Sequence, residues 1–158
     1  MGNNTFRKFV IIFVTLIGTG FGTWAGFTYY QYEKLFWIGT LVGLVSSFGL
    51  AKLYLGLLEK ISAKGYKKFI VWLLGTLIAV LCGIVCTTLV HGIMIATILI
   101  STAQSLHSLD VKYEGFLGVV IVGAEMIGAV AGFIAGVICS SMYVIKIMGK
   151  ADEAINPA

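Results

Sequence analysis

Two ionisable side chains, Glu125 and His91, interrupt long apolar stretches of the sequence and are the first candidates for chemistry. Glu125 lies in GVVIVGAEMIGAVAGFIAGVICS (118–140), and His91 lies in the otherwise uncharged stretch 69–103. An ionisable group inside a membrane is costly and often marks an ion or proton path. We therefore take both residues as candidates for ion or proton binding. The alternatives are an interhelical hydrogen bond for Glu125 and an interfacial position for His91, bonded to water or backbone.

No other pattern in the sequence names a reaction. The three cysteines lie inside apolar runs without metal-ligand spacing, which excludes a zinc motif and a disulfide framework and favours small packed side chains: Cys82, Cys86 and Cys139. The connector between the third and fourth spans has three side chains that could bind a metal, in no recognised metal-binding pattern: His107, Asp110 and Glu114. We predict no catalytic residues, no metal, no cofactor and no enzymatic activity.

The composition places the chain in a membrane. Of its 158 residues, 59% are hydrophobic and only 11% are charged, and the mean hydropathy is +1.00. A water-soluble domain has about 25% charged residues. The surface of this protein must therefore face lipid, and we predict an all-α, multi-pass integral membrane protein.

Four segments are long and apolar enough to cross about 30 Å of hydrocarbon as helices. They make one transmembrane domain over residues 1–158, with spans at about 9–30, 35–58, 69–95 and 115–145. The outer end of the third span is open within 90–103 because no charge ends it. Counting from Gly115 places Glu125 about 15 Å below the outer surface, near the midplane.

Basic residues predict the orientation. Eight fall on one side of a four-span protein: Arg7, Lys8, Lys60, Lys64, Lys67, Lys68, Lys146 and Lys150. Only Lys34 and Lys112 fall on the other side, and the stem of Lys52 is expected to snorkel toward the basic side. Both termini are thus predicted to be cytoplasmic, in an inner or plasma membrane. Topology and attraction to anionic lipid account for the net charge of +4, so no nucleic-acid partner is expected.

Small residues recur every four positions in all four spans and form ridges on helices. The predicted helix-packing glycines are Gly18, Gly22, Gly26, Gly39, Gly43, Gly75, Gly83, Gly128, Gly132 and Gly136. Lipid tails are as apolar as leucine, so close backbone approach must drive helix pairing. Four such ladders exceed the need of a simple four-helix core, and we expect some of them to face other chains.

The fragment VIVGAEMIGAVAG (120–132) resembles the carboxylate-bearing last helix of the four-span proteolipid subunits of rotary ATPases. Chain length and number of spans are also similar. Those proteins have a second related hairpin and a lumenal N-terminus, whereas the charge distribution here predicts that both ends are cytoplasmic. We therefore assign no family.

Three functions remain open. We favour a small integral membrane subunit of a larger or homo-oligomeric assembly, acting through helix packing rather than catalysis, with the bilayer and other membrane subunits or its own copies as partners. The alternative is a transporter or channel that conducts protons or cations through Glu125. Transporters usually have broken helices around a midplane site, and the only proline is Pro157 in the tail. A membrane enzyme acting on lipid comes third.

Overall fold

The computed structural model describes residues 3–28, 33–102 and 112–149, and these ranges are helical almost throughout. The helices are α1 (Asn3–Thr28), α2 (Glu33–Ala63), α3 (Lys68–Thr102) and α4 (Lys112–Tyr143), and a π-helical turn, η2 (Val144–Met148), extends α4. All four α-helices are long and apolar enough to span a membrane. The predicted all-helical, multi-pass architecture is confirmed at this level.

The helices extend beyond the predicted apolar spans. α1 has 26 residues and α3 has 35, which correspond to lengths of about 39 and 52 Å. The hydrocarbon core is only about 30 Å thick, so the helices tilt or project from it. The outer end of the third span was left open within 90–103, and α3 ends at Thr102, inside that range. Backbone hydrogen bonding in a helix does not depend on where the apolar stretch stops.

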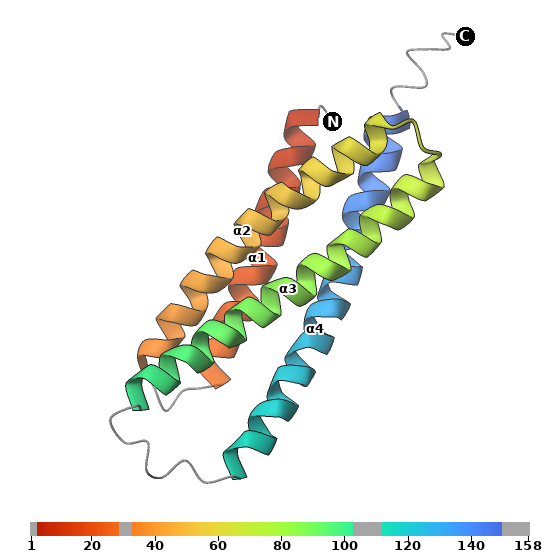
Figure 1. Cartoon of the computed structure of the whole chain (residues 1–158). Helices are drawn as coiled ribbons and strands as arrows, with labels where there is room; N and C mark the ends of the chain where they lie inside the picture. The colour runs from red at the N-terminus through yellow and green to blue at the C-terminus, as the bar shows by residue number, and fades with distance from the viewer. Residues whose placement is uncertain (1–2, 29–32, 103–111, 150–158) are drawn as a thin grey trace, which may run out of the picture.

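The four helices form two antiparallel hairpins, as Figure 1 shows. α1 packs along α2, α3 packs along α4, and α2 against α3 supplies most of the contact between the hairpins. The start of α1, the end of α2, the start of α3 and η2 all lie at one end of the bundle (Figure 1). This end contains Arg7, Lys8, Lys60, Lys64, Lys67, Lys68 and Lys146, and we call it the basic end.

A tight turn at the basic end joins α2 to α3. The Lys64 N–H donates to the Ile61 carbonyl at 3.2 Å, and the Gly65 N–H donates to the Ser62 carbonyl at 3.1 Å. Gly65 has a φ of 73°, the left-handed conformation that commonly ends a helix and that glycine adopts without a steric penalty. The local sequence thus reverses the chain between the hairpins.

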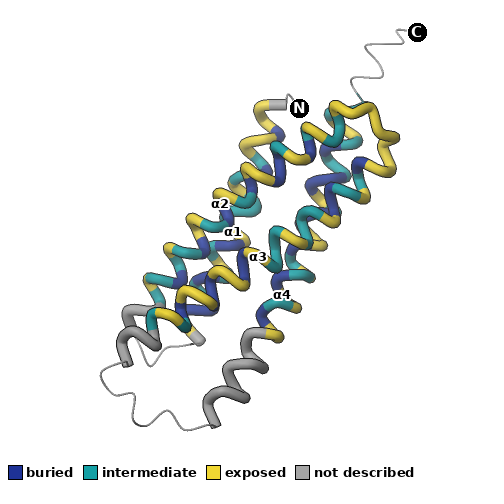
Figure 2. The backbone as a smooth tube through the Cα atoms, in the orientation of Figure 1, coloured by how far each residue is buried: buried dark blue, intermediate teal, exposed yellow. Residues whose placement is uncertain are grey.

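Buried residues lie toward the inside of the bundle and exposed residues lie on the outside (Figure 2). The larger buried cluster lies toward the basic end and draws on all four helices: Phe6, Val10, Tyr54, Leu55, Leu58, Val71, Cys139 and Tyr143. A smaller cluster lies toward the opposite end: Ala25, Val90 and Met94. The outward faces carry many large apolar side chains, such as Leu16 and Trp37, as expected of helices that face lipid.

Candidate functional site

The predicted glycines of α1 and α2 lie where these two helices cross. A Cβ atom added to Gly39 would lie 2.5 Å from the Gly22 carbonyl oxygen, and one added to Gly43 would lie 2.5 Å from that of Gly18. The same Cβ on Gly39 would lie 3.1 Å from the Cα of Gly26. Such distances leave no room for a side chain, so the two backbones are in direct contact.

The α3/α4 hairpin has an equivalent crossing. A Cβ on Gly132 would lie 2.6 Å from the carbonyl oxygen of Ala79, and one on Gly128 would lie 2.8 Å from that of Gly83. Gly136 and Gly75 lie further toward the basic end, against Thr76 and Ser140 respectively. The small residues of α3 and α4 thus face each other along one crossing.

Each small-residue ladder therefore has a partner ladder within the same chain. The expectation that some ladders contact other chains stays a prediction. Five other helical glycines differ, because a Cβ on any of them would meet nothing within 4 Å: Gly20, Gly49, Gly56, Gly92 and Gly123. A surface for other chains must be sought among such outward positions.

Hydroxyl groups add hydrogen bonds between helices. The Thr23 and Thr40 hydroxyls lie 3.1 Å apart across α1 and α2. The buried Tyr54 hydroxyl lies 3.0 Å from the Ser140 hydroxyl and links α2 to α4. Thr23 also donates to its own helix, as threonine commonly does. The Tyr54–Ser140 pair is important because it connects the two hairpins.

Glu125 lies at the edge of the α3/α4 crossing. Its side chain is partly buried, and its Oε1 lies 3.3 Å from the hydroxyl of Thr88, an exposed residue of α3. That hydroxyl has a shorter acceptor, at 2.9 Å, in the Ile84 carbonyl of its own helix. Ala124, which precedes Glu125 in the sequence and belongs to the small-residue ladder, is buried. Glu125 thus flanks the crossing, and its Oε1 faces a hydroxyl on the outside of the hairpin.

His91 has different surroundings. It is buried, with 3% of its surface exposed. Its Nδ1 lies 3.0 Å from the Thr87 carbonyl, and its ring lies 5.7 Å from the Phe21 ring of α1, measured between centroids. Phe21 in turn contacts Trp24. The His91 ring therefore packs against the other hairpin, while its Nδ1 lies beside a backbone carbonyl of its own helix.

The hydrogen bonds of His91 and Glu125 lead to different neighbours. Among the residues that the structure describes, the ion pair present is Arg7–Glu59, with 3.6 Å between Nη1 and Oε1. The ionisable pair that the sequence left open, Glu125 with His91, is thus not formed as an ion pair. The two side chains have separate positions: His91 lies in the interface between the hairpins, and Glu125 lies at the outer edge of the α3/α4 crossing.

The pairing of α3 with α4 also locates Glu125 along the bundle. Its partner Thr88 is 20 residues beyond Lys68, about 30 Å along α3 from the basic end. α4 has 32 residues and is about 48 Å long, longer than the hydrocarbon core. The midplane position of Glu125 stays a prediction.

A second run of small residues on α3 was missed in the sequence. Thr88, Gly92 and Ala96 are spaced by four, and all three are exposed; we call them the α3 outer ridge. Leu89 and Ile93 beside it are exposed and large. The spacing was visible in the sequence, but it is offset by one residue from the longer ladder that ends at Thr87. Only the helix pairing shows which of the two runs faces outward.

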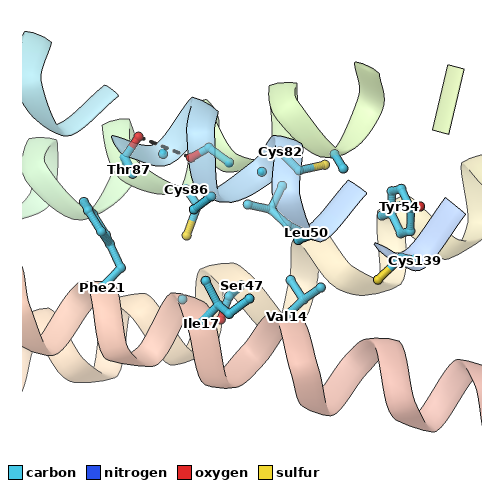
Figure 3. A pocket seen from close by; sticks show the side chains of 17 residues that line it. Val14, Ile17, Phe21, Ser47, Leu50, Tyr54, Cys82, Cys86, Thr87 and Cys139 are labelled. Carbon is cyan, nitrogen blue, oxygen red and sulfur yellow. Dashed lines mark hydrogen bonds between the residues drawn. The ribbon is translucent and has the colours of Figure 1, made fainter. Parts of the chain in front are cut away.

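A cavity separates the two hairpins (Figure 3). Val14, Ile17 and Phe21 of α1 line one side, and α3 and α4 line the opposite side. All three cysteines contribute to this lining, and none is in a disulfide: Cys82, Cys86 and Cys139. Cys86 lies 3.4 Å from the hydroxyl of Ser46 on α2.

One expectation about the basic residues is wrong. Lys52 was expected to extend toward the basic end, but its Nζ lies 4.4 Å from the centroid of the Phe48 ring, one turn in the opposite direction. Side chains on a helix tilt toward its N-terminus, and the N-terminus of α2 lies at the end of the bundle opposite the basic end. The Lys52 ammonium is therefore placed over an aromatic ring.

The described ranges contain no group of three or more His, Cys, Asp or Glu side chains placed to hold a metal ion. His107, Asp110 and Lys150 lie outside these ranges, as do the side chains of Lys34, Lys112 and Glu114. Comparisons of the chain with protein-family models, with curated proteins and with solved structures found no match. The function must be argued from the geometry.

Proposed function

We propose that the protein is a small integral membrane subunit of a larger or homo-oligomeric assembly, and that it acts through helix packing rather than catalysis. The observation that carries this proposal is the α3 outer ridge beside Glu125. Most other described outward positions on α3 carry large apolar side chains that suit lipid. The ridge instead has a hydroxyl, a bare glycine and an alanine, and it lies next to a carboxyl group.

The shape of this surface suits a helix from another chain. The large side chains of Leu89 and Ile93 flank the small ridge, and helices pack by placing the ridge of one into the groove of another. A Cβ on Gly92 would meet nothing within 4 Å, so a second backbone has room to approach. Close approach is what stabilises helix pairs in lipid.

The polarity of the surface supports the same partner. A charged carboxylate at the centre of a membrane helix costs about 2.5–3.5 kcal/mol on insertion scales. Glu125 has a hydroxyl donor in Thr88, and a helix on the outer ridge would shield this pair from lipid and could add a second donor. Such interhelical hydrogen bonds contribute about 0.6 kcal/mol on average. We expect the partner to be an apolar transmembrane helix with a donor at this level.

The test is the mass of the protein and of anything bound to it, measured after extraction in a mild detergent. Gly92→Leu should abolish the assembly, because the leucine side chain fills the space above the α3 outer ridge that the partner helix would occupy. It should preserve the helix content of the chain. The matched control is Gly49→Leu on α2, where a Cβ likewise meets nothing within 4 Å; it should change neither. A wild-type protein that is monomeric without co-purifying subunits would refute the proposal, as would an unchanged assembly mass for Gly92→Leu.

The second candidate function is proton or cation conduction through Glu125. The observation that favours it is the 3.3 Å contact between the Thr88 hydroxyl and the Glu125 Oε1, which brings two polar groups together at the outer edge of the α3/α4 crossing. Glu125→Gln preserves the shape and hydrogen bonding but removes the titration. If the carboxyl conducts, this variant in reconstituted vesicles should lose pH-driven flux while the assembly mass is unchanged. Equal flux in variant and wild type would exclude this function.

A further inference from the structure

The cavity between the hairpins has the character of a binding site for hydrocarbon. Its volume is about 80 Å³, and residues from all four helices line it. Its hydroxyl groups are already engaged: the Ser47 hydroxyl donates to the Gly43 carbonyl at 2.5 Å, the Thr87 hydroxyl donates to the Ile84 carbonyl at 2.8 Å, and the Tyr54 hydroxyl lies 3.0 Å from that of Ser140. The other polar groups of the lining are three thiols, which are weak hydrogen-bonding groups. A buried water needs two to four polar partners. The cavity offers too few, so its occupant must be apolar.

The size of the cavity narrows the class of occupant. A dry cavity of about 150 Å³ admits benzene, and this one is about half as large. A ring system such as a quinone head or a sterol therefore does not fit without separation of the hairpins. The end of a linear alkyl chain is narrow enough.

Packed side chains lie on both sides of the cavity along the bundle. Toward the basic end lies the buried cluster that contains Phe6 and Leu58, and toward the other end Phe21 packs on His91. Ala131 of α4 lines both the cavity and a shallow groove on the outward face of α4. On the α1 side of the cavity, Ile17 is 36% exposed. The route from the membrane into the cavity therefore passes between α1 and α4.

We propose that the end of one phospholipid acyl chain enters between α1 and α4 and occupies this cavity. Acyl chains are the molecules that surround these four apolar helices in a bilayer. A bound chain would fill the space between two hairpins that otherwise meet mainly through α2, α3 and the Tyr54–Ser140 hydrogen bond. The lipid then acts as a structural ligand that sets the spacing of the hairpins. This site is separate from the outer ridge, so it does not depend on the proposed assembly.

Photolabelling tests the proposal directly. The full-length protein is reconstituted in phosphatidylcholine vesicles that contain phosphatidylcholine with a diazirine at the end of one acyl chain. After irradiation, mass spectrometry locates the adducts. We expect adducts on cavity residues that are shielded from the bilayer, namely Cys86, Ala135 and Cys139, which are 8%, 8% and 1% exposed. Adducts confined to outward residues such as Val85 would overturn the proposal.

A filling variant provides the second arm. Ala131→Phe places a ring at the side opening and should eliminate the adducts on Cys86, Ala135 and Cys139 while those on outward residues persist. Val85→Phe, on the outward face of α3, is the matched control and should retain both sets. Persistence of the cavity adducts in a folded Ala131→Phe variant would show that the chain does not enter there. If this variant does not fold, the positions of the adducts in the wild-type protein are sufficient to support or overturn the proposal.

Discussion

Gly132→Ala is the smallest change that tests whether backbone contact holds α3 and α4 together. The added methyl carbon would lie 2.6 Å from the carbonyl oxygen of Ala79 and 3.0 Å from the Cα of Val80. An ordinary van der Waals contact for such a carbon is 3.4–4 Å. The two helices must therefore separate by close to 1 Å at the crossing, and neither neighbouring atom can rotate away because both belong to the backbone.

The expected cost follows from this geometry. Overpacking a close contact destabilises by about 1–3 kcal/mol, and the helices lose dispersion contacts along the rest of the crossing as they separate. Alanine has a higher helix propensity than glycine by about 1 kcal/mol in water, which would make the same substitution neutral or stabilising at an open position. The sign of the change in the free energy of unfolding thus distinguishes a glycine that contacts another backbone from a glycine at an open position.

Reversible unfolding in mixed micelles, with a rising fraction of a denaturing detergent and helix content as the signal, measures this difference. Gly123→Ala on the same helix is the control, because a Cβ there would meet nothing within 4 Å. We expect Gly132→Ala to lower the free energy of unfolding and Gly123→Ala to leave it unchanged or raise it. If both variants unfold at the wild-type detergent fraction, α4 does not contact α3 through this ridge and the packing argument fails.

Three further predictions follow from other contacts. Tyr54→Phe and Ser140→Ala should each destabilise by about 0.5–1.5 kcal/mol, and the double variant should cost less than their sum because they share one hydrogen bond; additive effects would show that the bond does not form. Phe6→Ala should destabilise by roughly 2 kcal/mol from cavity formation alone, since lipid is as apolar as the core, and an unchanged unfolding curve would contradict its burial. In a cysteine-free background in intact cells, Gly65→Cys should be shielded from an impermeant thiol reagent and Ser108→Cys should react, whereas the reverse pattern would invert the predicted orientation.

The sequence by itself determined the number and nature of the helices. Crossing a bilayer requires about 20 apolar residues in one segment. This is a local property that can be recognised directly in the sequence. The same locality explains the limits of that prediction. The uncharged stretch 69–103 left the outer end of the third helix open, because no charged residue ends it, and the structure ends α3 at Thr102.

The tertiary structure decided which ridges meet. The ladders share a spacing of four residues, so nothing in their pattern specifies that Gly22 packs on Gly39 and Gly83 on Gly128. Pairing depends on the three-dimensional crossing of whole helices. Once each ladder has its partner, the run Thr88, Gly92 and Ala96 remains outside, although its spacing is the same as that of the buried runs.

The surroundings of the two ionisable candidates were decided at the same level. The position of Glu125, one residue from a small-residue ladder, predicted a place beside a crossing, and the structure has it there. Which neighbour it meets depends on the register between α3 and α4, and that register places it against the Thr88 hydroxyl rather than His91. Sequence spacing describes the faces of one helix, whereas contacts between helices depend on rotation and register, which no single segment contains.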